Sequence, residues 1–274
     1  MIPADLNLLI KYSIKSNLKV TLNLGPIKTF RYPEVYIPEF VLQKAGEIPV
    51  GYVVNKDSFL GQSALKYLNQ LVKKLIQDYG QDELENTIKA FQLDNEPKNP
   101  FGPTQMTMGD DYMAESVKIL SSYFNKPILF SGPLSPVSLN GILNPDVNKL
   151  FNATKTISNK IIGINYYHYV PGAPALKQLN LYPDNYVGLL GGFGNSLITQ
   201  FKDTVFEVSE CQMEPWGGGS PYDIPGNSLA ELRFSILRNI REMRKFSPAN
   251  IPFLISLWGI EGLVYNAVND KLSD

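Results

Sequence analysis

Residues 88–97 read IKAFQLDNEP: a short apolar run followed closely by an asparagine, a glutamate and a proline. A second run of this kind, residues 204–209 (TVFEVS), is followed at once by Glu210. Short apolar runs are typical of strands buried on both faces of a parallel sheet. A carboxylate at the mouth of such a sheet is costly to desolvate, so it persists mainly where it is paired or takes part in chemistry. Glu96 and Glu210 are therefore candidate functional residues.

Strand-like and helix-like patterns alternate along the whole chain, which is typical of βα units around a parallel sheet. The predicted strands are residues 19–24, 88–93, 127–131, 161–167, 204–209 and 251–256. The predicted helices cover about 5–16, 61–79 and 110–124, and a last one follows Asn227. In the first helix, spacing places Leu6, Leu9 and Ile10 on one face. The sequence thus predicts an α/β fold.

Each predicted strand is followed by a loop rich in Gly, Pro, Trp or Tyr, which indicates the active face of a TIM (β/α)8-type barrel. A closed barrel of this type has eight strands, and only six are predicted here. We expect that strand 1, helix 1 and strand 2 are missing, as if the chain began inside the second helix. The alternative is an open doubly wound sheet, but no G-x-G-x-x-G motif opens a helix. Residues 191–194 (GGFG) follow a loop and are interpreted as a flexible connection.

Composition limits the kinds of partner. The 274 residues, 44% hydrophobic with 25 basic and 26 acidic side chains, predict one domain over residues 1–274. Near-zero net charge gives no electrostatic footprint for nucleic acid or anionic lipid, and no stretch is apolar enough for a membrane span. We expect an uncharged or small partner. No signal peptide is visible, so the localisation is unknown and cytoplasmic by default.

Cysteine and histidine usage limits cofactor chemistry. The only cysteine, Cys211, cannot form an internal disulfide, and one Cys with one His cannot build a closed zinc site without carboxylates. We therefore expect no metal and no cofactor.

Several segments resemble the clan of retaining (β/α)8 glycosidases, with the nearest likeness to prokaryotic cellulase- or β-galactosidase-like members. They are residues 24–26 (LGP), 31–34 (RYPE), 91–97 (FQLDNEP), 210–216 (ECQMEPW) and 257–261 (LWGIE). In that clan an Asn-Glu pair after the fourth strand supplies the acid/base, and a Glu at the seventh supplies the nucleophile. The resemblance implies that Glu96 is the acid/base and Glu210 the nucleophile, roughly 5 Å apart across one cleft. It also implies that Asn95 holds the sugar 2-hydroxyl.

Glu214 is a second candidate for the nucleophile. Glu210 is preferred because it directly ends the strand pattern, whereas Glu214 precedes Pro215 in a loop.

The resemblance implies further substrate-binding residues. Trp258 corresponds to the clan's strand-eight tryptophan under the reactive sugar, and Trp216 offers a second platform for stacking. Tyr167 matches a clan tyrosine that hydrogen-bonds the nucleophile, and His168 lies beside it. Arg31 lines the strand-three loop or forms an ion pair there, as does Glu34. The clan's strand-two arginine has no counterpart in this sequence.

The expected activity is hydrolysis of an oligosaccharide or another β-glycoside without a cofactor. Two alternatives stay open within this fold: an inactive fragment, and a sugar-binding pseudoenzyme that kept the aromatic platforms. A third belongs to another enzyme class, because Cys211 and His168 end adjacent predicted strands and a thiolate-imidazole pair is conceivable.

Overall fold

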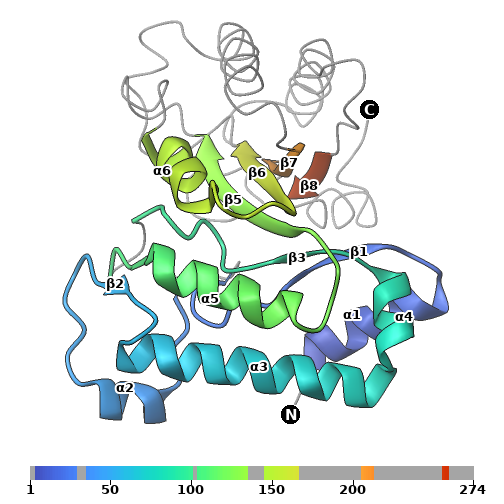
Figure 1. Cartoon of the computed structure of the whole chain (residues 1–274), viewed down its shortest axis with the longest axis horizontal. Helices are drawn as coiled ribbons and strands as arrows, with labels where there is room; N and C mark the ends of the chain where they lie inside the picture. The colour runs from blue at the N-terminus through green and yellow to red at the C-terminus, as the bar shows by residue number, and fades with distance from the viewer. Residues whose placement is uncertain are drawn as a thin grey trace, which may run out of the picture. The chain divides into compact units, whose positions relative to one another are not determined.

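A computed structural model describes residues 4–29, 35–100, 104–134, 145–166, 205–212 and 255–258 (Figure 1). The helices are α1 (Ala4–Lys15), α2 (Glu39–Ala45), α3 (Phe59–Tyr79), α4 (Gln81–Thr87), α5 (Asp110–Ser121) and α6 (Pro145–Thr154). The strands are β1 (Val20–Asn23), β2 (Val53–Val54), β3 (Ile88–Gln92), β4 (Thr107–Met108), β5 (Ile128–Leu134), β6 (Lys160–Tyr166), β7 (Val205–Gln212) and β8 (Ile255–Trp258).

The main sheet has six strands in the order β1-β3-β5-β6-β7-β8, which is the order of the chain. The pairings β1–β3, β3–β5 and β7–β8 are parallel. A doubly wound sheet reverses its strand order at a switch point, whereas barrel strands follow one another without reversal. The fold is therefore α/β with a TIM-type partial barrel, and the described residues supply six of the eight strands that closure needs. β2 and β4 form a separate two-stranded parallel sheet.

The six predicted strands coincide with strands of this sheet. The last one extends beyond its predicted end: β8 is described over Ile255–Trp258, whereas the prediction was 251–256. Residues 251–254 and the helix predicted after Asn227 lie outside the described residues.

The chain divides into two compact units, which we describe separately. Unit 1 comprises Met1–Gly132 and Asp146–Ile162, and unit 2 comprises Pro133–Pro145 and Gly163–Asp274. Unit 1 holds β1 to β4 and the helices α1 to α5, and unit 2 holds β7 and β8. The single domain expected from composition stays a prediction.

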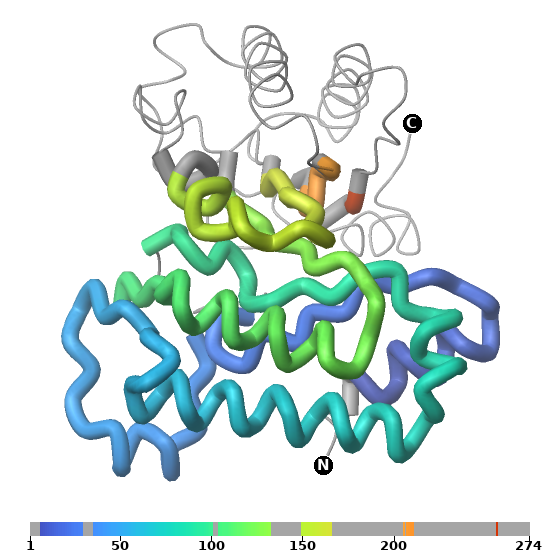
Figure 2. Tube along the Cα trace, in the orientation of Figure 1, coloured from blue at the N-terminus to red at the C-terminus, as the bar shows by residue number. Residues whose placement is uncertain are grey.

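Helices α3 and α5 contact each other and form much of the core of unit 1; Figure 2 shows them running side by side. α3 begins two residues before its predicted start because the hydroxyl of Ser58 accepts a hydrogen bond from the N–H of Gly61. It ends at Gly80, whose φ of 79° suits glycine. Their buried apolar side chains include Leu68, Leu71, Val72, Leu75, Tyr112, Met113 and Leu120.

Helix α1 differs from its predicted amphipathic face. It contacts α4, and Ile10 and Ser13 are its fully buried positions, whereas Leu9 is 45% exposed. Residues three apart lie along one narrow stripe, and Leu9 stands about 100° away from Ile10 around the helix. Leu9 lies outside that stripe, so the prediction that it shares a buried face with Ile10 was wrong.

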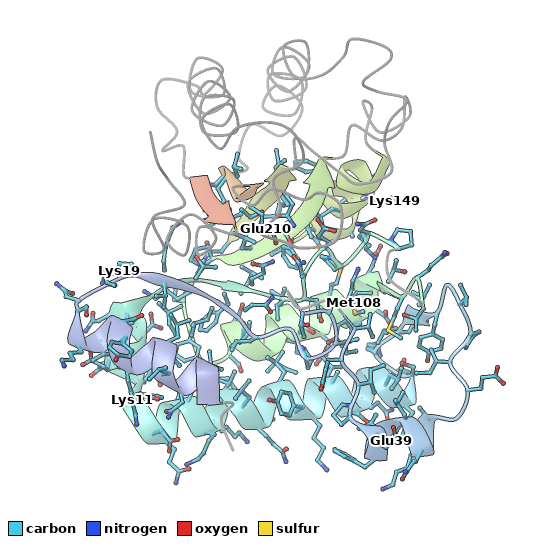
Figure 3. All side chains as sticks on the ribbon, turned by 180° about the vertical axis from the view of Figure 1, so that it is seen from behind. Lys11, Lys19, Glu39, Met108, Lys149 and Glu210 are labelled. Carbon is cyan, nitrogen blue, oxygen red and sulfur yellow. The ribbon has the colours of Figure 1, made fainter. Side chains whose placement is uncertain are left out.

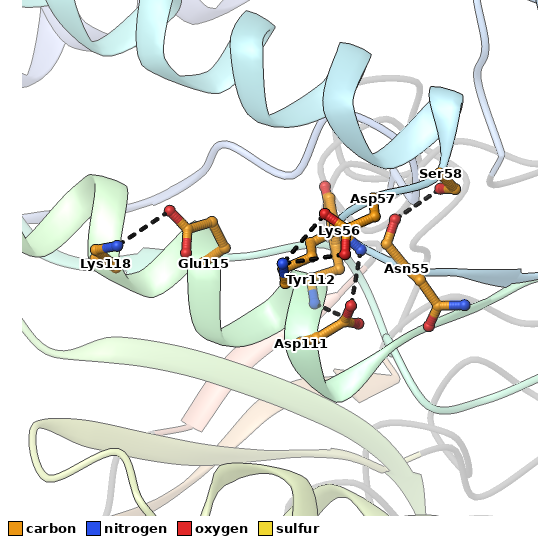
Figure 4. Close-up of polar contacts among 8 residues, drawn as sticks. All are labelled: Asn55, Lys56, Asp57, Ser58, Asp111, Tyr112, Glu115 and Lys118. Carbon is orange, nitrogen blue, oxygen red and sulfur yellow. Dashed lines mark hydrogen bonds and ion pairs between the residues drawn. The ribbon is translucent and has the colours of Figure 1, made fainter.

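A surface cluster connects the start of α3 to α5 (Figure 4). We use this name for residues 55–58 together with Asp111, Glu115 and Lys118. The Lys56 N–H donates to the Asp111 carboxylate at 3.1 Å, and the Lys118 ammonium lies 3.5 Å from Glu115. The Lys56 ammonium pairs with Asp57, whose side chain is 78% exposed. Water competes for these groups, so they join the two helices with little net electrostatic gain.

Candidate active site

Glu96 lies in a turn of residues 94–99, directly after β3; we call it the strand-end turn. The side chains of Asp94, Asn95 and Glu96 are buried, and Glu96 is only 7% exposed. Asp94 and Glu96 have positive φ angles of 52° and 45°. This left-handed conformation is uncommon outside glycine, and it costs on the order of 1 kcal/mol at each residue. The surroundings must therefore hold the turn in place.

Contacts with Ser131, Lys28 and Asn99 help to fix Glu96. Its N–H donates to the Ser131 hydroxyl at 3.0 Å, and its carbonyl accepts from the Lys28 ammonium at 2.7 Å. The Asn99 side-chain amide donates to its carboxyl oxygen Oε2 at 2.7 Å. The backbone is held on both sides of Cα and the carboxyl group is held at its end. A carboxyl group restrained in this way is suited to directional proton transfer.

Ser131 also orients Asn95. Its hydroxyl oxygen accepts hydrogen bonds from the Glu96 N–H and from Gln92 Nε2 at 2.9 Å, which occupies both lone pairs. The hydroxyl proton is then donated to Asn95 Oδ1, 3.1 Å away. Because the side-chain oxygen of Asn95 accepts from Ser131, the amide N–H groups of Asn95 are the donors that it can offer to a bound molecule.

Asp94 connects the strand-end turn to the loop after β1. Its Oδ1 accepts from the N–H groups of Ile27 at 3.1 Å and Lys28 at 2.8 Å, and Tyr112 donates to Oδ2 at 3.4 Å. Burial raises the pKa of Asp94, while the Lys28 and Ile27 N–H groups, the Lys28 charge and the Tyr112 hydroxyl oppose that rise. Burial, together with the negative charge of Asp94, raises the pKa of Tyr112 well above its ordinary value.

Glu210 lies on β7 of unit 2 (Figure 3) and is 4% exposed. The sequence pattern predicted that this strand ends at Ser209, but β7 continues to Gln212. Its pairing with β8 shifts register between Val208 and Cys211, which places one extra residue on β7. A bulge of this kind breaks the alternation of side chains and can redirect one of them. Glu210 is therefore within the strand, at the irregularity, and does not directly follow its end.

The neighbouring strand of unit 2 contributes a polar contact that the sequence analysis did not anticipate. The Ser209 hydroxyl donates to Asn165 Oδ1 at 2.6 Å, and Asn165 on β6 is fully buried. β6 is described as far as Tyr166, and the predicted site residue Tyr167 comes next, outside the described residues. Glu207, three residues before Glu210, is equally buried.

The structure describes the other predicted site residues only in part or not at all. Trp258 lies on β8 and pairs with Gln212 through the backbone. The structure describes its backbone and not its side chain. The following predicted residues lie wholly outside the described ranges: Arg31, Glu34, Tyr167, His168, Glu214 and Trp216. Because Glu96 belongs to unit 1 and Glu210 to unit 2, their mutual distance stays a prediction.

Within the described ranges, no group of three or more His, Cys, Asp or Glu side chains is arranged to hold a metal ion. In the same ranges, no helix has the length and apolar character needed to cross a bilayer.

No protein-family model and no curated protein matches the chain. Among solved structures, a β-glucosidase from Exiguobacterium marinum matches with a TM-score of 0.51 and 13% identity, over 92% of this chain and 68% of that one. A hyperthermophilic β-glucosidase from Pyrococcus furiosus matches with a TM-score of 0.38 and 12% identity, over 70% and 50% of the chains. A β-glucuronidase from Ruminococcus gnavus matches with a TM-score of 0.41 and 15% identity, over 88% and 43%.

The chain therefore spans about half the length of the last two proteins. At these identities the likeness concerns the fold, and the first match carries it. The chain shares its (β/α)-barrel type of fold, as a partial barrel, with that β-glucosidase.

Proposed function

We propose that the chain is a retaining β-glycoside hydrolase in which Glu96 is the acid/base and Glu210 the nucleophile. The observation that carries the proposal is the buried Glu96 carboxyl group at the carboxyl end of β3, held in a strained turn by Ser131, Lys28 and Asn99. The clan resemblance of residues 91–97 and 210–216 supports the assignment of roles.

A structural role alone accounts poorly for Glu96. Burying its carboxyl group adds a desolvation cost, and the positive φ adds strain. Both costs are understandable where a carboxyl group must be held ready to transfer a proton.

In the first proposed step, a carboxylate oxygen of Glu210 forms a bond to the anomeric carbon of the sugar. The bond from that carbon to the glycosidic oxygen breaks, and its electron pair stays on the oxygen. Glu96 donates its proton to this oxygen, so the leaving group departs as a neutral alcohol.

In the second step, Glu96 is a carboxylate and accepts a proton from water. The water oxygen bonds to the anomeric carbon while the bond to Glu210 breaks, which restores both side chains and retains the configuration. Asn95 donates its amide N–H to the sugar 2-hydroxyl, a contact that its hydrogen bond from Ser131 favours.

The test measures hydrolysis of a panel of aryl β-glycosides by the wild-type chain, Glu96→Gln and Glu210→Gln. For a substrate with a poor leaving group, each substitution should lower kcat/KM by about 10²- to 10⁴-fold. Glu207→Gln is the matched control, because Glu207 lies on the same strand as Glu210 and is buried to the same extent. It should retain most of the activity.

Equal rates for the wild-type chain and Glu96→Gln would remove Glu96 from the mechanism. Binding of a plain sugar without turnover of any substrate in the panel would indicate a sugar-binding pseudoenzyme. Inactivation by a thiol-alkylating reagent, with both glutamate variants still active, would favour chemistry at Cys211.

A further inference from the structure

Lys28 is a buried charge that the proposed mechanism does not use. It lies in the loop after β1 and its side chain is fully buried. Its ammonium group donates to the carbonyl oxygens of Glu96 at 2.7 Å and Asn99 at 2.6 Å. A buried ammonium group is costly unless it is paired and hydrogen-bonded. Two carbonyls and the nearby charge of Asp94 meet that requirement here.

The loop of Lys28 and the strand-end turn are interlocked through the backbone. The N–H of Lys28 donates to Asp94, and its carbonyl accepts from the N–H of Asn95 at 2.9 Å. Gly25 brings the two segments close together, because a Cβ atom there would lie 2.1 Å from the backbone nitrogen of Asp94. The position of Lys28 is therefore fixed by the same residues that it contacts.

These contacts converge on the backbone of Glu96. Ser131 holds its N–H, and Lys28 holds its carbonyl on the other side of a residue with a φ of 45°. Lys28 also holds the carbonyl of Asn99, whose amide contacts the Glu96 carboxyl group. Removing the ammonium group takes one donor from each of the two carbonyls, and the Glu96 carbonyl then keeps the N–H of Asn99 at 3.0 Å. The turn loses its tie to the loop after β1 at these two points and can relax. A displacement of about 1 Å at a reacting group can lower a rate by about 10²-fold.

We propose that Lys28 is a positioning residue that holds the Glu96 carboxyl group in place for proton transfer to the glycosidic oxygen. This inference rests on the proposed function and deepens it. Volume alone does not explain a lysine here, because an apolar side chain of similar length would fill the space without the cost of burying a charge. The carbonyls of Glu96 and Asn99, which both accept from it, explain the ammonium group.

Lys160 provides a matched comparison within unit 1. Its ammonium group also donates to two backbone carbonyls, those of Thr154 at 2.9 Å and Ile157 at 3.0 Å. Lys160 is the first residue of β6, so it lies at the opposite end of its strand from the carboxyl end that bears functional residues in a barrel. Both acceptors belong to the end of α6 and the loop that follows it, and not to the strand-end turn.

The test compares Lys28→Met with the wild-type chain on aryl β-glycosides whose leaving groups range from dinitrophenol to phenol. Dinitrophenol departs without protonation, whereas phenol needs the proton of Glu96. We expect kcat/KM for the dinitrophenyl glycoside to fall by no more than about threefold, and for the phenyl glycoside by about 100-fold. The dependence of rate on leaving-group pKa should therefore become steeper.

Lys160→Met is the control and should leave that dependence unchanged. Lys28→Gln, which keeps an N–H donor on a shorter side chain, is the second variant if Lys28→Met does not fold. Equal losses for all leaving groups would overturn the inference in favour of a purely structural lysine, as would unfolding of both Lys28 variants. If the wild-type chain hydrolyses none of the substrates, the proposed function fails and the inference fails with it.

Discussion

The strand-end turn, taken with its partner Lys28, and the surface cluster both combine lysine, carboxylates and asparagine, but they do so in opposite surroundings. Lys28, which contacts the turn from the loop after β1, is fully buried, and Glu96 is nearly so. In the surface cluster, the side chains of Lys56 and Asp57 are 44% and 78% exposed. Tyr112 takes part in both, because its hydroxyl donates to Asp94 while its N–H donates to Asp111.

This difference in burial predicts which side chains can be substituted at little cost in stability and which cannot. Solvent weakens the contacts of the surface cluster and also satisfies any group that loses its partner. In the strand-end turn a lost partner leaves a buried polar group unsatisfied, and that cost is high. Polar residues retained despite this cost are the more informative guide to function.

Lys28→Met should have the largest effect on stability. It removes the ammonium donor from the carbonyls of Glu96 and Asn99, and it removes the positive charge next to the buried Asp94. The free energy of unfolding should fall by about 3–5 kcal/mol in a denaturant titration. Lys56→Met is the counterpart in the surface cluster and should produce no measurable change. Similar effects of the two substitutions would contradict the contrast between the regions.

Gly25→Ala should come next, because the added Cβ would lie 2.1 Å from the nitrogen of Asp94 and 2.3 Å from its Cα. Backbone must move to make room, so we expect a loss of about 2–3 kcal/mol in unfolding free energy and lower activity. Gly46→Ala is the control: its φ is 76° and nothing lies within 4 Å of the added Cβ. It should cost about 1 kcal/mol from backbone strain alone and leave activity unchanged.

Asp94→Asn should change how stability depends on pH. Because burial raises the pKa of Asp94, the folded chain binds the proton more tightly than the unfolded chain does. The stabilisation from Asp94 is complete below its unfolded pKa of about 3.8 and is lost as pH rises through the raised folded value. The unfolding free energy of the wild-type chain minus that of Asp94→Asn should therefore decrease as pH rises above 3.8, by at most about 1.4 kcal/mol per pH unit.

Denaturant titrations of both chains across this pH range measure the difference. A difference that increases with pH would mean that Lys28 and the N–H groups outweigh burial at Asp94.

Lys118→Gln should have a smaller effect than Lys28→Met, Gly25→Ala and Asp94→Asn. Its side chain is 78% exposed, and its ion pair with Glu115 spans three residues of α5. The loss of unfolding free energy, obtained from the shift in melting temperature, should be less than about 0.5 kcal/mol. Added salt should make this loss smaller still, because it screens the ion pair. A larger loss would show that the surface cluster is more than a solvated connection between helices.

The main sheet could be predicted from sequence because its strands are buried on both faces and form continuous apolar runs, as residues 88–93 do. The shorter elements were missed for a physical reason. α2 (Glu39–Ala45) and α4 (Gln81–Thr87) have seven residues each, which is too short for a repeating apolar pattern. α4 has Leu84 as its one apolar residue, so no helical face is visible in its sequence.

The candidate site was predicted only in part. Asn95 and Glu96 form a recognisable pair after a predicted strand, and both are buried in the strand-end turn. Lys28 and Ser131 are 68 and 35 positions away from Glu96 in the sequence. No local pattern shows whether a loop lysine points inward or toward water, because that depends on segments that meet only after folding. The positive φ angles of Asp94 and Glu96 likewise could not be predicted from the sequence.

The most direct test of the central claim is labelling with a 2-deoxy-2-fluoro β-glycoside, which forms the glycosyl-enzyme readily and releases it slowly. We predict one covalent label per chain, which peptide mass spectrometry should find on Glu210. It should be absent from Glu210→Gln, present in Glu207→Gln, and lost when the labelled enzyme is left to turn over. A label on Glu214, or hydrolysis of aryl β-glycosides without any covalent label, would contradict the proposed double displacement through Glu210.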